Sequence, residues 1–288
     1  MFRILLITIA VLSLVSLTLG FTGRWLALGE SLAVFRLPSL LVVCLCLPVI
    51  RKTKYFYAAL GLIILSLLSV AIHYLPQKLS SQDTYRLYQE NLSFRLQNTD
   101  ALKADILSTK ADFIALQEVT KNNRAFIKDL EGHFPYQATC PFASIGGVSV
   151  MSRWPDMGER ECVKGMSAIK IKTPTGPLWV ISVHLYWPYP YGQAEQVQKL
   201  TKKINALKGP KIIAGDFNMV PWSHTLKSFE RASDTQTARP IHSFDLPYIP
   251  MNIPIDHVLV PSGLNAITLR REKKGSDHYG VLAEFNRP

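Results

Sequence analysis

The sequence lacks the short motifs that mark several common catalytic classes. It has no Walker-type glycine loop, because Gly146-Gly147 is too short to form a phosphate cradle. No serine lies in a nucleophile elbow, and no spacing of cysteines and histidines fits a zinc site. Internal repeats and low-complexity tracts are also absent. The sequence therefore gives no support for P-loop chemistry, for an elbow-type serine hydrolase or for a zinc module.

Cysteines and acidic residues are scarce. The 288 residues include 4 cysteines, and 21 acidic residues stand against 32 lysines and arginines, for a formal net charge of +11. A basic chain suits a phosphate-rich substrate or an anionic membrane face, and ordinary solubility accounts for it equally well. Cys44 and Cys46 lie in an apolar run. Cys140 and Cys162 are the remaining two; an exported protein can pair them, but their spacing does not decide this.

The first 75 residues contain long apolar runs with almost no charge. These runs cover residues 4–20, 37–50 and 56–75. They predict a transmembrane region at 1–75 with about three helices. The middle run is short unless it extends back across Arg36. Two spans with a re-entrant or interfacial piece around 25–35 are therefore the alternative.

Charge predicts the orientation of this region. The loop 51–54 is the densest basic stretch near the apolar runs, so the positive-inside rule places it in the cytoplasm. With three crossings, the chain beyond a short polar linker at 76–83 lies on the periplasmic or extracellular side. We therefore expect a multi-pass protein of the inner or plasma membrane. The lipid bilayer is then one partner, and no protein partner is predicted.

Two tetrapeptides place polar side chains at the ends of apolar runs. Gly215-Asp216-Phe217-Asn218 follows the run 211–214, and Gly275-Ser276-Asp277-His278 precedes the run 279–285. Both runs are typical of buried strands, and strand ends are where rigid scaffolds present chemistry. Asp216 and Asn218 are two residues apart, so in an extended chain they point the same way and Phe217 points into the core.

Further polar residues end or interrupt other apolar runs, namely Asn91, Gln117-Glu118, His184 and Asp256. With the two tetrapeptides, this ordered set resembles the endonuclease/exonuclease/phosphatase superfamily, which includes DNase I, neutral sphingomyelinases and inositol-phosphate 5-phosphatases. The resemblance covers residues 84–288. The whole chain looks like a membrane-anchored, bacterial-type member of the superfamily. It implies an α+β fold, the four-layer α/β/β/α sandwich of two packed β-sheets, here preceded by the transmembrane helices.

The resemblance also implies hydrolysis of a phosphate ester with a divalent cation, Mg²⁺ or Mn²⁺. Because Mg²⁺ is a hard ion that prefers oxygen ligands, Glu118 is the first candidate ligand, assisted by Asn91 and Asp277. By the same resemblance, Asp216 orients or deprotonates the attacking water. Asn218 holds a phosphoryl oxygen, and Asn91 also contacts the substrate.

Histidines supply the remaining candidate catalytic groups. His278 needs a partner that fixes its tautomer, and Asp256 is the candidate. Such a pair raises the pKa of the imidazole, so that it can contact the phosphate as a cation. His184 supplies a second imidazole. His257 directly follows Asp256, so on a strand it should point away from the site.

The leading interpretation is a membrane-anchored, metal-dependent phosphoesterase. Its substrate is a phosphodiester or phosphomonoester of a nucleic acid or a lipid head group. The alternative is a non-catalytic, membrane-tethered domain that binds a phosphorylated ligand. Two aromatic loops, 186–191 and 221–224, follow site residues. Stacking on a base, contact with a head group and simple loop packing all fit these loops.

Overall fold

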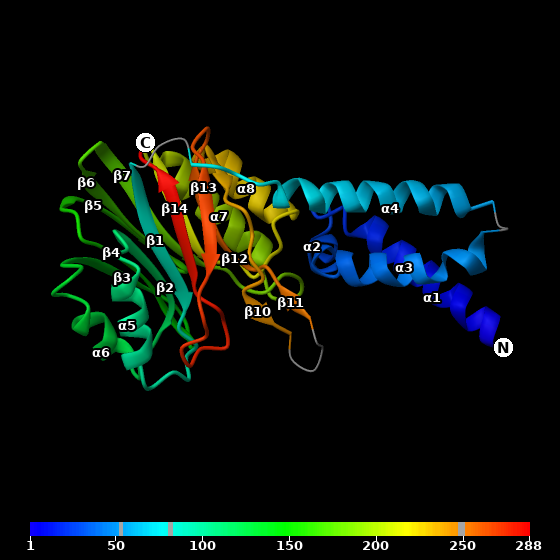
Figure 1. Cartoon of the computed structure of the whole chain (residues 1–288), viewed down its shortest axis with the longest axis horizontal. Helices are drawn as coiled ribbons and strands as arrows, with labels where there is room; N and C mark the ends of the chain where they lie inside the picture. Colours follow the sequence, from blue (N-terminus) through cyan, green and yellow to red (C-terminus); the bar gives the residue numbers. More distant parts are fainter. Residues whose placement is uncertain (52–53, 80–82, 247–250) are drawn as a thin grey trace.

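The computed structural model describes residues 1–51, 54–79, 83–246 and 251–288, with backbone only for Phe2 and Arg3. Lys52 and Thr53 of the basic loop and residues 80–82 of the predicted linker lie outside the described residues. Figure 1 shows a bundle of apolar helices that projects from one side of a body of packed β-sheets and helices.

The bundle contains α1 (Phe2–Leu19), α2 (Ala27–Val34), α3 (Arg36–Ile50), α4 (Phe56–Ala71) and the 3₁₀ turn η1 (Ile72–Tyr74). The three apolar runs of the sequence correspond to α1, α3 and α4, with ends shifted by a few residues. α3 begins at Arg36 and meets α2 at a bend of 67°. The middle run therefore does not continue backward as one straight helix.

By length and composition, one helix is suited to cross a bilayer. α4 and η1 together form an apolar segment from Phe56 to Tyr74, with a mean hydropathy of 2.1 and 22% of it buried. α2 and α3 pass the same test only as one broken span, and the apolar helix Ile4–Leu19 is shorter. The described residues thus offer one or two candidate spans, where the sequence suggested about three.

Two six-stranded sheets form the body, with strand orders β13-β14-β1-β2-β4-β3 and β5-β6-β7-β8-β12-β9. The first sheet consists of β1 (Thr84–Asn91), β2 (Phe113–Val119), β3 (Tyr136–Ala143), β4 (Gly146–Ser152), β13 (Ala266–Arg270) and β14 (Val281–Asn286). The second consists of β5 (Asp156–Val163), β6 (Met166–Thr173), β7 (Gly176–His184), β8 (Lys211–Asp216), β9 (Thr235–Thr237) and β12 (Asp256–Pro261). A separate pair is formed by β10 (Phe244–Asp245) and β11 (Asn252–Ile253).

Helices cover the outer face of each sheet (Figure 1). They are α5 (Asp100–Ser108) and α6 (Arg124–Asp129) on the first sheet, and α7 (Gln193–Ala206) and α8 (His224–Ser233) on the second. Strand β2 shows why the outer face needs a cover. Its residues Phe113 and Ala115 join the core between the sheets. Ile114 and Leu116 point the other way and pack under the helices. Since both faces are apolar, both must be covered. The predicted four-layer α/β/β/α sandwich is confirmed.

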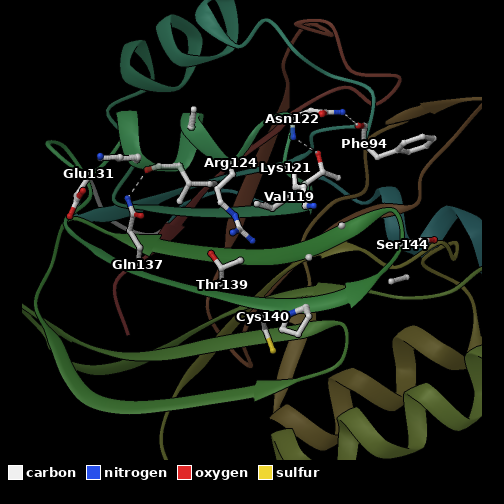
Figure 2. A pocket seen from close by; sticks show the side chains of 18 residues that line it. Phe94, Val119, Lys121, Asn122, Arg124, Glu131, Gln137, Thr139, Cys140 and Ser144 are labelled. Atoms are coloured by element: carbon white, nitrogen blue, oxygen red, sulfur yellow. Dashed lines mark hydrogen bonds between the residues drawn. The ribbon is translucent and has the colours of Figure 1, made fainter.

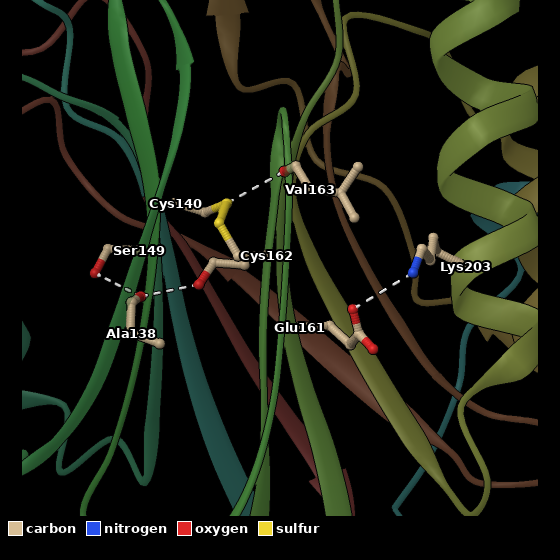
Figure 3. The surroundings of a disulfide bond; sticks show 8 residues. Ala138, Cys140, Ser149, Glu161, Cys162, Val163 and Lys203 are labelled. Atoms are coloured by element: carbon tan, nitrogen blue, oxygen red, sulfur yellow. Dashed lines mark hydrogen bonds and ion pairs between the residues drawn. A yellow bond between two sulfur atoms is a disulfide. The ribbon is translucent and has the colours of Figure 1, made fainter.

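A disulfide joins the two sheets. Cys140 on β3 bonds to Cys162 on β5, with their Cα atoms 5.5 Å apart (Figure 3). β3 and β5 are the edge strands of their sheets, so the bond connects the sheets at one end of the sandwich. Nearby, Ser167 Oγ donates a hydrogen bond to the carbonyl of Ala138 on the other sheet at 3.0 Å. The sequence left this pairing open, and the structure contains it.

Candidate active site

The fold brings the polar strand ends to one edge of both sheets. β1 and β2 run parallel, and Asn91 pairs with Gln117 where these strands end. β7 and β8 also run parallel, and their last residues, His184 and Asp216, pair with each other. β12 runs antiparallel beside β8 and begins at Asp256, opposite Asp216. The register of both sheets therefore gathers these side chains from distant parts of the sequence.

Asp256 and His278 form a buried pair. His278 Nδ1 lies 2.8 Å from Asp256 Oδ2, and Gln89 Nε2 donates to Asp256 Oδ1 at 2.8 Å. The remaining ring nitrogen of His278, Nε2, lies 3.8 Å from Asp216 Oδ2. Burial opposes the charged form of His278, but the adjacent Asp256 carboxylate raises its pKa well above 6.5. The imidazole is therefore a cation near neutral pH.

Asp216 lies between two imidazoles. Its Oδ2 is 3.5 Å from His184 Nε2 and accepts a hydrogen bond from Asn91 Nδ2 at 3.0 Å. Burial, and then the negative charge of Asp256, raise the pKa of Asp216. Burial, and then the charge of His278, lower the pKa of His184 to about 3, so this imidazole is neutral. A carboxylate whose pKa is raised in this way is suited to accept a proton.

The segment after β8 departs from the extended conformation assumed from the sequence. Asn218 has a φ of +49°, which residues other than glycine rarely adopt. Its Nδ2 donates to the carbonyl of Leu185 at 2.8 Å, and its backbone N–H donates to Asp216 Oδ1 at 2.8 Å. The extended-chain argument was therefore wrong for Asn218, because the positive φ turns the chain. Asp216 and Asn218 still line one cleft, and Phe217 is buried in the core as expected.

Glu118 occupies an irregular position at the end of β2. Its φ is +55°, at a shift in the register between β2 and β4. Its Oε1 accepts from Asn91 Nδ2 at 3.2 Å, and its Oε2 accepts from the backbone N–H of Phe94 at 2.6 Å. Burial raises the pKa of Glu118 despite these bonds. A cation beside the carboxylate would offset that cost.

The oxygen atoms around Glu118 suit a hard divalent cation. Asp277 is exposed and lines the same cleft as Glu118. Asn91 Oδ1 accepts one hydrogen bond, from the backbone N–H of Ser93, and keeps a second lone pair. A set of two carboxylates and one amide oxygen is of the kind that Mg²⁺ or Mn²⁺ prefers. The residues present therefore fit the ion expected from the sequence.

A second group of donor atoms lies deeper. Asp216, Asp256 and His278 each offer an atom within 4.8 Å of the others, so they too could surround a cation. Both oxygens of Asp256 are already engaged, however, by Gln89 and by His278. Because Asp256 has no free oxygen, this group fits proton transfer better than metal binding, and Glu118 as the principal metal ligand stays a prediction.

Six of the eight candidate site residues open onto one small cleft. Its volume is about 200 Å³, and the six are Glu118, His184, Asp216, Asn218, Asp277 and His278. Asn91 and Asp256 do not line the cleft but hold residues that do. Tyr186, Trp187 and Phe244 also line it, so part of the lining of the cleft is aromatic.

A larger groove of about 1090 Å³ adjoins the cleft (Figure 2). It begins beside Phe94, the residue whose N–H binds Glu118, and runs between α6 and strands β3 and β4. None of the candidate site residues lines it, so the groove is distinct from the candidate reaction centre. Its charged lining residues are Lys121, Arg124, Lys128 and Glu131.

Three supporting residues were missed in the sequence, namely Gln89, Ser243 and Phe244. Gln89 lies two residues before Asn91 and shares its strand face, a signal that could have found it. Ser243 Oγ accepts the backbone N–H of Asp256. The Phe244 ring lies 4.7 Å, centroid to centroid, from the His278 ring. No local pattern marks Ser243 or Phe244, because their role depends on long-range contacts.

Comparison with known proteins identifies the family. The profile of the Endonuclease/Exonuclease/phosphatase family matches residues 90–278, which is more than half of the chain. The chain belongs to this family. The resemblance drawn from the motifs at the strand ends is therefore confirmed. No curated protein sequence matches the chain.

Solved structures with the same fold share little sequence with this member of the endonuclease/exonuclease/phosphatase family. D. rerio TDP2 complexed with single-strand DNA product has a TM-score of 0.55 and 15% identity, covering 71% of this chain and 99% of that one. Sphingomyelinase C from Streptomyces griseocarneus has a TM-score of 0.51 and 16% identity, covering 72% and 100%. A mutant beta toxin from Staphylococcus aureus with bound magnesium ions has a TM-score of 0.51 and 15% identity, and the match covers 72% of this chain and 100% of the toxin. At such identities the likeness shows the fold alone.

Proposed function

We propose that the chain hydrolyses phosphate esters with the help of a divalent metal ion. The observation that carries this proposal is the buried Asp256–His278 pair, whose histidine opens onto the cleft that also holds Asp216 and Glu118. Membership of a family of endonucleases, exonucleases and phosphatases supports the same reaction class.

Glu118, Asp277 and the Oδ1 atom of Asn91 would hold the ion, Mg²⁺ or Mn²⁺. When bound, the ion offsets the negative charge of the phosphate and of the leaving oxygen. The magnesium ions in the structurally similar beta toxin agree with this choice.

The side chains around the cleft supply the other functions. His278, kept cationic by Asp256, directs its Nε2–H at a phosphoryl oxygen and stabilises the charge that develops there. Asp216 orients a water molecule with Oδ2 and takes its proton. Asn91 Nδ2 donates a hydrogen bond to that same oxygen, and His184 Nε2 lies 3.5 Å from it. Both keep the carboxylate in position.

The substrate extends beyond the reacting phosphate. We assign Asn218, which lines the cleft, to contact with a phosphoryl oxygen. Asn91 was also expected to contact the substrate, but its Nδ2 already donates to Glu118 and Asp216, so we assign it to holding these two carboxylates and the ion. Lys121, Arg124 and Lys128 then contact further anionic groups along the adjoining groove. The class of substrate is a nucleic acid or a lipid head group, and both classes occur among proteins of this fold, as the TDP2 and sphingomyelinase structures show by name.

We also propose that residues 1–75 anchor the enzyme in a membrane, with a linker at 76–83 and the catalytic domain at 84–288. Leu45 in α3 and Leu68 in α4 are 71% and 63% exposed, and a bilayer would cover such surfaces. The basic loop then faces the cytoplasm, and the catalytic domain lies on the periplasmic or extracellular side. The disulfide between the sheets supports an oxidising compartment.

A substrate panel tests the proposal. The full-length protein in nanodiscs is assayed with bis(4-nitrophenyl) phosphate, plasmid DNA, sphingomyelin vesicles and phosphatidylinositol phosphate vesicles, in Mg²⁺, in Mn²⁺ and in EDTA. We expect metal-dependent turnover of one class that is lost in His278→Gln. Full activity in EDTA would contradict the proposal. Binding of a phosphorylated ligand with no turnover of any substrate would favour the non-catalytic alternative instead.

A further inference from the structure

Helix α2 joins the apolar bundle to the catalytic body. In Figure 1 it lies at the base of the bundle, next to the body. Its hydrogen bonds to the body fall on two segments, 185–193 and 217–226, and both segments supply residues that line the cleft. This arrangement differs from a passive anchor that is connected to the catalytic domain only through a linker.

Glu30 of α2 caps the first turn of α8. Its Oε1 accepts the backbone N–H of His224 at 2.9 Å, and its Oε2 accepts that of Thr225 at 3.0 Å. The first N–H groups of a helix have no partner within the helix, and α8 has no acid in its own first turn. Glu30 is only 7% exposed, so its carboxylate is committed to this contact.

Two more hydrogen bonds fasten α2 to the loops of the cleft. Trp222 Nε1 donates to the carbonyl of Ala33 at 2.9 Å, shortly after Asn218 in the chain. Ser31 Oγ donates to the carbonyl of Tyr189 at 2.9 Å, in the aromatic loop that follows His184. α2 thus contacts the segments that follow two of the candidate catalytic strand ends.

Gln193 links these segments beneath the surface. Its Oε1 accepts from Thr225 Oγ1 at 3.4 Å, and its Nε2 donates to the carbonyls of Phe217 and Tyr186. Gln193 is 3% exposed, so these bonds are shielded from water. A continuous series of contacts therefore runs from Glu30 through Thr225 and Gln193 to the residues beside Asp216.

The close fit around Glu30 depends on Gly23. A Cβ atom at Gly23 would lie 2.0 Å from Glu30 Oε1, so any side chain there would displace the carboxylate. The substitution Gly23→Ala therefore moves Glu30 without changing the charge of the protein.

We infer that α2 is a positioning element of the active site, and that Glu30 is its principal positioning residue. The apolar segment holds the loops 185–193 and 217–226 in their catalytic arrangement through Glu30, Ser31 and Ala33. The effect on turnover rests on the proposed hydrolase function. The effect on the order of the loops does not depend on it.

Two readouts on the full-length protein in nanodiscs test this inference. Hydrogen–deuterium exchange follows the peptides that cover 185–193 and 217–226, with β3 and β4 as the internal reference. Steady-state kinetics with bis(4-nitrophenyl) phosphate follows kcat and KM separately. The variants are Glu30→Ala, Glu30→Gln and Gly23→Ala, with Glu159→Ala as the control. Glu159 pairs with Lys170 on the second sheet and has no role at the cleft.

We expect faster exchange in both loop segments in Glu30→Ala and Gly23→Ala, with β3 and β4 unchanged. We also expect kcat to fall roughly tenfold with little change in KM, because small misplacements of catalytic groups mainly slow the chemical step. Glu30→Gln, which keeps one acceptor oxygen, should recover part of both effects. Glu159→Ala should match the wild type.

Two exchange results would overturn the inference. Faster exchange confined to 224–233 would make Glu30 an ordinary helix cap. Faster exchange throughout the body in Glu30→Gln would make it a general stability residue. If the wild type shows no hydrolysis, the proposed function fails, while the exchange experiment still decides the role of α2.

Discussion

At the scale of single residues, the site depends on how neighbouring groups set each other's charge. Asp256 is bound by Gln89 and paired with His278, which keeps the histidine cationic. The charge of His278 in turn helps to keep His184 neutral. Two imidazoles on either side of Asp216 therefore carry different charges and can serve different roles.

Removing the imidazole at 278 should abolish most of the activity. His278→Gln keeps a polar side chain but cannot carry the positive charge, so we expect kcat to fall by roughly 100-fold or more. The matched control is His133→Gln, an exposed histidine outside the cleft. The measurement is turnover of bis(4-nitrophenyl) phosphate at saturating metal. A His278→Gln enzyme within threefold of wild type would contradict the assigned role.

His257 should make the stability of the protein depend on pH. It points away from the cleft, as expected, and its Nε2 lies 2.8 Å from the carbonyl of Met219. Burial lowers the pKa of His257 from 6.5 to about 4. Between these values the unfolded chain binds a proton that the folded protein does not, so stability falls as the pH drops from 6.5 to 4.

The size of this effect can be measured with a variant. We expect His257 to contribute up to about 3 kcal/mol of this loss. Urea unfolding of the wild type and of His257→Gln at pH 7, 6, 5 and 4 measures it. The variant should lose less stability than the wild type over this range. Parallel losses in both proteins would show that His257 does not cause the dependence.

At the scale of elements, β3 and β5 matter because each is the edge strand of its sheet. The Cys140–Cys162 bond joins them and restrains the sandwich at that end. Cys140→Ser with Cys162→Ser should lower the free energy of unfolding by about 2–4 kcal/mol, since the unfolded chain loses a cross-link. The control is Cys44→Ser with Cys46→Ser, which removes two free thiols from α3. Equal stability of the two double variants in urea would contradict the prediction.

The groove between α6 and strands β3 and β4 should select for polyanionic substrates. Arg124→Glu with Lys128→Glu reverses two charges there without touching the cleft. If the substrate extends along the groove, kcat/KM for plasmid DNA or for anionic vesicles should fall at least tenfold, while kcat/KM for bis(4-nitrophenyl) phosphate stays unchanged. Equal losses on large and small substrates would show that the variant damages the cleft instead.

At the scale of the whole molecule, local patterns in the sequence predicted the sandwich and most of the cleft. An apolar run that ends in polar residues predicts a strand and the side chains at its end. This prediction does not require the order of the strands in the sheet. The contact between Gln89 and Asp256 could not be predicted, because it joins residues 167 apart through the register of two sheets. The docking of Glu30 on Thr225 spans 195 residues for the same reason.

The three apolar runs in the chain give no sign of the bend between α2 and α3, because hydrophobicity does not depend on the direction of the helix axis; about three spans, or two with an interfacial piece, stays a prediction. The break of 67° between α2 and α3 leaves a helix that starts at Arg36. The short helix before the break, α2, packs on the sandwich: Glu30 accepts a hydrogen bond from His224, and the carbonyl of Ala33 accepts one from Trp222. The apolar segment and the sandwich are therefore in direct contact, beyond their connection through the linker.

The metal dependence of Glu118→Gln tests the central claim most directly. The full-length protein is stripped with EDTA and assayed with bis(4-nitrophenyl) phosphate while Mg²⁺ or Mn²⁺ is added back, with Glu131→Gln as the matched control. We predict that none of these proteins is active without metal. Because Glu118 is assigned as the principal ligand, the metal concentration that gives half-maximal activity should be at least tenfold higher in Glu118→Gln than in the wild type or the control. Activity without metal, or identical metal titrations for Glu118→Gln and the wild type, would contradict the account.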